Sequence, residues 1–241
     1  MVLSTMLHID PDSLTRSLAE LSERAAPVSD EDLSASVQLV VERAASVFKV
    51  SGVGLMLIGA DGELRYVASS AGTAREFELA QIEIGEGPCI DSFVLGNLVQ
   101  SSDMHTDARW PRLSTMLAEA PIHAVLGVPT RINSETVGTL NAYSDEPHEW
   151  DASDVAALEA YARVLEGLLT GALAARTSGR LVDQLQHALD RRVAIERSIG
   201  LVMGRDRVDA ITAFNTLRTT ARSERRRVAD VAAELLGRWE A

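Results

Sequence analysis

The chain has 241 residues, 46% of them apolar and 24% charged, and a formal net charge of −12. This composition is ordinary for a globular protein, the length allows one or two domains, and no apolar stretch approaches the roughly 18–20 residues that a membrane span needs. The charge is unevenly distributed: residues 1–177 hold eleven basic and twenty-six acidic side chains, whereas residues 178–241 hold twelve arginines and nine acidic side chains.

Two helices are expected at the start of the chain. Leucines recur at helical spacing over residues 12–25, where Asp12 or Ser13 can cap the helix and Pro27 ends it. Residues 30–48 carry a longer apolar stripe, with acidic side chains in the first turn, where the helix dipole favours them.

The apolar period then changes to that of β-strands. Residues 53–58 form an apolar run typical of a buried strand, and Asp61-Gly62 predicts a two-residue hairpin turn into a second strand over 64–69. The elements expected after it are a helix at 73–80, a turn at 85–88, a helix at 89–95, a strand at 98–100, a loop at 107–111, strands at 124–129, 130–133 and 136–143, and a helix at 152–174. Antiparallel strands flanked by helices indicate an α+β layer architecture.

This part of the chain resembles a GAF domain. The matching residues are Gly85 to Cys89, Asp107 to Pro111, Val128-Pro129, Gly138 to Asn141, and Tyr143. The resemblance implies a sensory domain over residues 30–177, built on an antiparallel sheet flanked by helices. Residues 1–29 would then be an N-terminal helical extension.

The last sixty-odd residues are arginine-rich and helical in pattern, with a net charge of +3. On charge alone they are either a solvated tail or a module that meets a polyanion. Their pattern resembles the ANTAR domain, a three-helix RNA-binding antitermination module that often follows a GAF domain in actinobacterial regulators. The matching residues are Ala188-Leu189, Arg192, Ile195-Glu196, Gly200, Val202-Met203, Ala213-Phe214, Leu217-Arg218, Ala221, Arg226-Arg227 and Asp230 to Ala232. The resemblance implies a small all-α domain over residues 178–241 that binds paired hairpin loops of a nascent transcript.

The joint between the two modules lies near Gly179. Glycine inside a helix costs about 1 kcal/mol relative to alanine, so a long helix with a soft joint and a plain break between two helices both fit. The apolar stripe from Val155 to Val202 is longer than one domain needs. We therefore expect a parallel homodimer through these helices, which would also place two RNA-binding heads on one transcript.

No arrangement of residues typical of catalysis is present. The five histidines are scattered without metal-ligand spacing, and no Walker lysine follows Gly85 and Gly87. Some GAF-like proteins reduce methionine sulfoxide, but that chemistry calls for several cysteines and this chain has one. We expect no enzyme activity, no metal and no cofactor. The single thiol and the lack of a long apolar core in residues 1–26 also predict a cytoplasmic protein.

A ligand pocket is expected over the central sheet, with an organic ligand contacted by Cys89, Trp110 and Tyr143. Cys89 follows a proline at a helix start, where the helix N-terminus lowers a thiol pKa, as a redox sensor requires. The alternative is a small core residue, which is the more frequent role of a free cysteine. Asp91 and Arg109 either orient polar parts of the ligand or pair on the surface.

The RNA contacts are expected from arginines left at or near the surface once Asp209 and Ser223 cap the last two helices. Arginine suits both phosphate contact and stacking on splayed bases. The expected RNA-binding residues are Arg205, Arg218, Arg222, Arg225, Arg226 and Arg227.

Two other functions remain open. A DNA-binding regulator would use residues 223–237 as a recognition helix, although Asp230 and Glu234 on its outer face disfavour contact with duplex phosphates. Ile199 and Ala229 depart from the ANTAR pattern, so a ligand-binding or dimerisation protein with a degenerate output domain is the third interpretation.

Overall fold

The computed structural model describes residues 9–23, 29–117, 120–175 and 179–240. Its centre is an antiparallel sheet of five strands in the order β2-β1-β5-β4-β3. The strands are β1 (Gly52–Ile58), β2 (Leu64–Ser69), β3 (Val99–Ser101), β4 (Ala124–Ile132) and β5 (Glu135–Ser144). The expected α+β architecture is confirmed, except that residues 130–132 continue β4 and are not a strand of their own.

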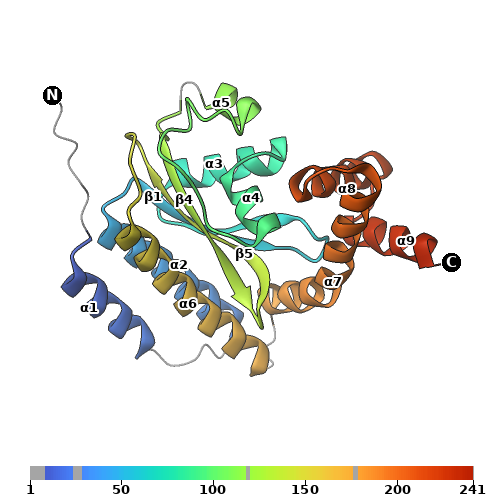
Figure 1. The fold of residues 1–241 in the computed structure, drawn as a ribbon. Helices are drawn as coiled ribbons and strands as arrows, with labels where there is room; N and C mark the ends of the chain where they lie inside the picture. Colours follow the sequence, from blue (N-terminus) through green and yellow to red (C-terminus); the bar gives the residue numbers. More distant parts are fainter. Residues whose placement is uncertain (1–8, 24–28, 118–119, 176–178, 241) are drawn as a thin grey trace.

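Helices cover both faces of this sheet (Figure 1). α2 (Asp30–Phe48) and α6 (Ala152–Ala174) pack against one face, and α1 (Pro11–Ser22) lies outside them. The other face carries α3 (Gly72–Ile84) and α4 (Pro88–Leu95), with α5 (Pro111–Met116) against α3. The chain then continues into α7 (Arg180–Asp206), α8 (Ala210–Glu224) and α9 (Val228–Glu240).

The start of α1 differs from the expectation. Its N-cap is Asp10, whose carboxylate accepts the backbone N–H of Ser13 at 3.2 Å, so the expected cap at Asp12 or Ser13 is wrong. Pro11 explains the earlier start. The N–H that proline lacks would have no acceptor within the helix at this position, and the fixed φ of proline suits a helix. Pro27, expected to end the helix, lies outside the described residues.

The β1–β2 hairpin has the expected strands but a longer turn. The Gly62 N–H donates to the Gly59 carbonyl at 2.9 Å, and the Gly59 N–H donates to the Glu63 carbonyl at 2.8 Å. Gly62 has a φ of 87°, in the left-handed region. The loop therefore spans three residues, a turn followed by a left-handed glycine, and the expected two-residue turn is wrong.

The C-terminal helices decide how the two modules are joined and which of the expected helix caps are correct. α6 and α7 are separate helices, and Gly179 is the N-cap of α7. The expected alternative of a break between two helices is therefore the one observed. Asp209 caps α8 as expected and accepts the Thr212 N–H at 2.7 Å. Ser223 lies inside α8, which ends at Arg225 in a left-handed conformation. The expected cap at Ser223 is therefore wrong, and α9 begins five residues later, at Val228.

The apolar stripes of α6 and α7 are both covered within one chain. Leu158, Leu165 and Leu169 of α6 are fully buried in a helix that contacts α2 and β4. Leu185 and Ile195 of α7 are equally buried in a helix that contacts α8, α9, β1 and β5. The stripe that suggested a dimer is thus used for packing inside the monomer. Among the described residues, no helix has the length and apolarity for a membrane crossing.

Candidate functional site

The α7–α9 segment packs firmly against the sheet-containing part of the chain (Figure 1). The rings of Phe93 on α4 and Phe214 on α8 meet edge to face, with centroids 6.0 Å apart. Arg192 on α7 is 2% exposed, lies over the Phe93 ring at 4.3 Å from its centre, and pairs with Glu196 at 2.7 Å. The Ala229 N–H at the start of α9 donates to the Asp61 carbonyl in the β1–β2 turn at 3.3 Å.

Arginines from α8 bind the C-terminal end of α3. The last carbonyls of a helix lack partners within the helix and carry its negative dipole end. Arg218 donates to the Ile82 carbonyl at 2.6 Å, and Arg222 donates to the same carbonyl at 2.9 Å and to that of Glu83 at 3.1 Å. These two guanidinium groups therefore cap α3 from outside.

Glu63, the residue before β2, completes this contact. One of its carboxylate oxygens lies 3.4 Å from Nε of Arg218 and 3.7 Å from Nε of Arg222. The Arg218 side chain is only 5% exposed, and its burial lowers the pKa of the guanidinium while Glu63 opposes that shift. A charge in this position needs a partner, so Glu63 is the group that makes the burial of Arg218 tolerable.

Gly85 is what lets Arg218 approach so closely. It ends α3 with a φ of 77°, a conformation that favours glycine. A Cβ atom at this position would lie 2.2 Å from Nη1 of Arg218. The glycine expected in a turn therefore also shapes the surface on which α8 docks.

Comparison with family models identifies both parts of the chain. Residues 32–169 match the GAF domain model, and residues 183–236 match the ANTAR domain model. The chain belongs to the GAF domain family. It carries an ANTAR domain after the GAF domain, so the GAF–ANTAR architecture expected from the sequence is confirmed. A search of curated protein sequences gave no match.

Solved structures support the GAF fold. The chain is similar to the GAF domain of a phosphoenolpyruvate-protein phosphotransferase from Coxiella burnetii, with 19% identity, a TM-score of 0.54, and coverage of 68% of this chain and 94% of that one. The matching domain from Acinetobacter has 18% identity, a TM-score of 0.52 and the same coverage. The free methionine-R-sulfoxide reductase of Staphylococcus aureus has 15% identity and a TM-score of 0.53, with coverage of 69% and 99%.

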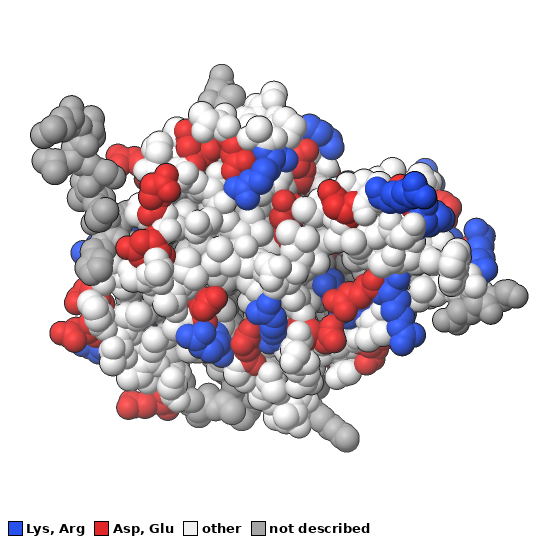
Figure 2. Space-filling view, viewed as in Figure 1, with Lys and Arg blue, Asp and Glu red and all other residues white. Residues whose placement is uncertain are grey.

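The six arginines expected to bind RNA do not form one exposed surface. Figure 2 shows basic side chains over the C-terminal helices, interspersed with acidic ones, and further basic side chains over the rest of this face. Arg225 and Arg227 are exposed and their side chains form no hydrogen bond or ion pair with any described residue, whereas Arg226 pairs with Glu224 and Glu234 at 2.8 and 2.6 Å. The other three lie elsewhere: Arg205 pairs with Asp206 at 2.7 Å, and Arg218 and Arg222 face the GAF domain.

The expected exposure of Arg218 is wrong. Its side chain is buried because the Ile82 carbonyl and Glu63 surround it. Sequence reasoning missed both partners, which lie 136 and 155 residues away along the chain. No local signal marks Glu63 as different from the other acidic residues.

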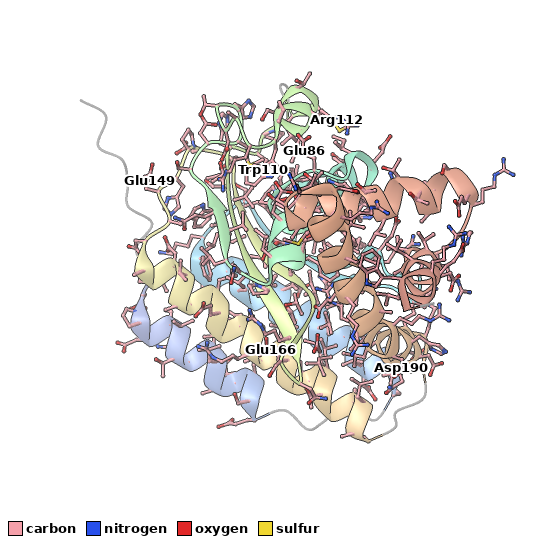
Figure 3. The ribbon with its side chains drawn as sticks, turned by 45° about the vertical axis from the view of Figure 1, so that its right-hand side comes forward. Glu86, Trp110, Arg112, Glu149, Glu166 and Asp190 are labelled. Atoms are coloured by element: carbon pink, nitrogen blue, oxygen red, sulfur yellow. The ribbon has the colours of Figure 1, made fainter. Side chains whose placement is uncertain are left out.

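A cleft of about 490 Å³ opens where the GAF domain meets α8. One wall comes from α3 to α5 and the other from α8 and its N-cap. Figure 3 shows Glu86, Trp110 and Arg112 gathered on this side of the GAF domain, close to α8. The lining residues are Ile84, Gly85, Glu86, Asp91, Arg109, Trp110, Arg112, Asp209, Ile211, Thr212, Asn215, Arg218, Thr219 and Arg222.

The three residues expected to bind a ligand are split between this cleft and the core. Trp110 lines the cleft, and its indole N–H donates to Asp91 at 2.8 Å. Cys89 and Tyr143 are fully buried under α3, with Sγ and the phenol oxygen 3.6 Å apart. Arg109 pairs with Asp107 at 2.6 Å. That these residues contact a ligand therefore stays a prediction, and Trp110 is the one that lies at a cavity.

A buried polar cluster centred on Glu78 of α3 lies between this helix and the sheet. Oε1 of Glu78 accepts the Tyr143 hydroxyl at 2.9 Å and the Asn141 amide at 3.2 Å. Gln81 donates to Sγ of Cys89 at 3.0 Å and accepts the Cys89 N–H at 2.9 Å. Burial raises the pKa of Glu78 to about 8, and burial followed by the charge of Glu78 raises the pKa of the Cys89 thiol.

Glu78→Gln should make the protein less sensitive to alkaline pH. The folded-state pKa of about 8 lies above the ordinary value of 4.5, so the folded chain keeps a proton that the unfolded chain loses in this window. Unfolding free energy therefore falls as pH rises, by up to about 1.4 kcal/mol per pH unit from this group. Thermal melts at several pH values should show Glu78→Gln above the parent near pH 8. Glu76→Gln, on the exposed side of α3, should follow the parent; identical pH slopes for all three proteins would show that Glu78 is ionised when folded.

Cys89 should be unreactive in the folded protein. The thiol is fully buried and its pKa is raised, and alkylation requires an accessible thiolate. Iodoacetamide at mildly alkaline pH should leave the native mass unchanged, whereas full modification should follow in guanidinium chloride. Rapid modification of the native protein would instead support the redox-sensor interpretation.

Proposed function

We propose that this GAF–ANTAR protein is a transcription antitermination regulator that binds paired hairpin loops in a nascent transcript. Its ANTAR domain would stabilise the hairpins and so prevent formation of a terminator stem. The observation that carries the proposal is the basic end of the ANTAR domain, where Arg225 and Arg227 are exposed and unpaired within the described residues. Arginines placed this way can contact separate phosphates or stack on splayed bases.

The contact between the domains supports a closed state that has a low affinity for RNA. Arg218, whose side chain is 5% exposed, cannot reach a phosphate while it binds the Ile82 carbonyl, whereas the side chain of Arg222, which binds the same carbonyl, stays about half exposed. Full RNA binding by the six arginines then requires α8 to leave α3. Because the two states differ in which groups these arginines contact, a signal that weakens the contact with the GAF domain shifts the population toward RNA binding.

We also propose that the protein acts on RNA as a homodimer. The α6 and α7 stripes are covered within one chain, so they no longer supply a dimer surface. Two heads on a two-hairpin transcript still require two ANTAR domains, which a dimer formed on RNA would provide.

We also propose that the protein catalyses no reaction. Some proteins with a similar fold are methionine sulfoxide reductases, but the lone Cys89 here is buried and hydrogen-bonded. The described residues contain no cluster of three or more side chains that could hold a metal ion.

Binding of the full chain to a two-hairpin RNA, compared with a duplex DNA of equal length, tests the function. We expect the RNA to bind more tightly, with two protein chains per RNA by sedimentation. Equal or tighter binding of the duplex would favour a DNA-binding regulator, and binding of neither would favour a ligand-binding protein with a degenerate ANTAR domain.

A further inference from the structure

The cleft between the GAF domain and α8 has the volume of a small-molecule site and a mainly polar lining. Its volume of about 490 Å³ falls within the usual range for ligand pockets, roughly 300–1,000 Å³. It lies beside the buried cluster of Phe77, Met104 and Tyr143 under α3, to which Trp110 of the cleft lining also belongs. A ligand in the cleft would touch both domains, whereas a ligand under α3 would touch only one.

Asp91, which lines the cleft, has one carboxylate oxygen without a hydrogen-bond partner among the described residues. Its side chain is 8% exposed, and Trp110 donates to only one of its carboxylate oxygens. The other oxygen, Oδ1, is buried and has no hydrogen-bond partner among the described residues. A buried carboxylate oxygen without a donor is costly, so a donor group from a ligand would be well accommodated there.

Charges of both signs line the cleft. Burial, and after it the charges of Asp209 and Glu86, raise the pKa of Asp91 to about 6, while the Trp110 hydrogen bond and the charge of Arg109 oppose this rise. Arg112 and Arg222 line the same cleft, and each donates to a carbonyl at the end of α3. A cation is favoured beside Asp91, and an anion is favoured beside the two arginines.

We propose that this cleft binds a small zwitterion of the amino-acid class, with its ammonium group on Asp91 and its carboxylate toward Arg112 and Arg222. Such a molecule holds the two walls together. It therefore binds the closed arrangement more tightly than an open one, and by linkage it opposes any ligand that needs α8 released. This last consequence rests on the proposed RNA-binding function, whereas the binding itself does not.

The binding is tested by calorimetry on the full chain without RNA, using the standard L-amino acids as probes. We expect at least one to bind, and its N-acetyl derivative, which lacks the cation, to bind about tenfold or more weakly. Asp91→Asn should cause a similar loss, because its amide oxygen can still accept the Trp110 N–H while its NH₂ group faces the ammonium. Glu83→Gln, an exposed change outside the cleft lining, should bind as the parent does.

Two results would overturn the site. One is the absence of binding by every probe to a folded chain, and the other is equal binding by the parent and Asp91→Asn. The regulatory consequence is tested separately by adding the bound amino acid to the RNA titration, where RNA affinity should fall. If RNA affinity does not change, the linkage is wrong, and if no RNA binds at all, the proposed function fails while the calorimetric result still stands.

Discussion

Replacing Glu63 with glutamine should raise the affinity of the chain for hairpin RNA by about tenfold, although Glu63 lies in the GAF domain. Its carboxylate is 3.4 Å from Nε of the buried Arg218, and removal of one partner leaves an unpaired charge in the closed state. The side chain of Glu63 is 16% exposed, so the substitution should cost less than breaking a fully buried pair. We expect it to destabilise the closed state by about 1.4 kcal/mol, which corresponds to the tenfold change in affinity. If the open state is the minor one, RNA affinity rises with its population.

Glu83→Gln is the matched control for this experiment. It makes the same charge change nearby, but the exposed Glu83 side chain forms no hydrogen bond or ion pair with either arginine, and only the Glu83 carbonyl accepts from Arg222. Fluorescence titration with labelled RNA would measure both variants, and hydrogen exchange of the α8 amides would report its release. Equal RNA affinity for Glu63→Gln and Glu83→Gln would mean that the contact between the domains does not restrain RNA binding.

The double substitution Arg226→Ala and Arg227→Ala should weaken RNA binding at every salt concentration. Each phosphate contact contributes about 0.7 to the salt dependence for single strands, so the slope should flatten by about one unit or more. The ion pairs that Arg226 makes with Glu224 and Glu234 are exposed, and such pairs contribute little to folding. The melting temperature should therefore barely move.

A second double variant separates specific contacts from overall charge. Arg43→Ala with Arg163→Ala removes the same charge from α2 and α6, where both side chains are about half or more exposed. RNA titrations over a range of salt should leave this control close to the parent. Should the Arg226 and Arg227 variant bind as well as the parent does, the arginine run is a solvated turn and not a binding site.

The helices and strands were predictable where local patterns specify them. α2 begins and ends as the apolar stripe predicts, and Asp209 caps α8 because its side chain serves a backbone donor three residues away. The errors fall at element ends. Ser223 has the right residue type for a cap, but the chain turns at Arg225, which ends α8 in a left-handed conformation.

The amino-acid sequence by itself determined the two modules, their order, and the arginine-rich character of the second. The charge asymmetry and the helical and strand periodicities are local properties of the sequence, and the two modules follow from the motif residues that resemble the GAF and ANTAR families. Only the tertiary structure decided which arginines are available. Arg218 and Arg227 differ little in sequence context, yet one is buried against Glu63 and the Ile82 carbonyl and the other is exposed. The cleft beside Asp91 has the same origin, because its two walls come from segments that are far apart in the sequence, residues 84–112 and 209–222, and no local pattern encodes their meeting.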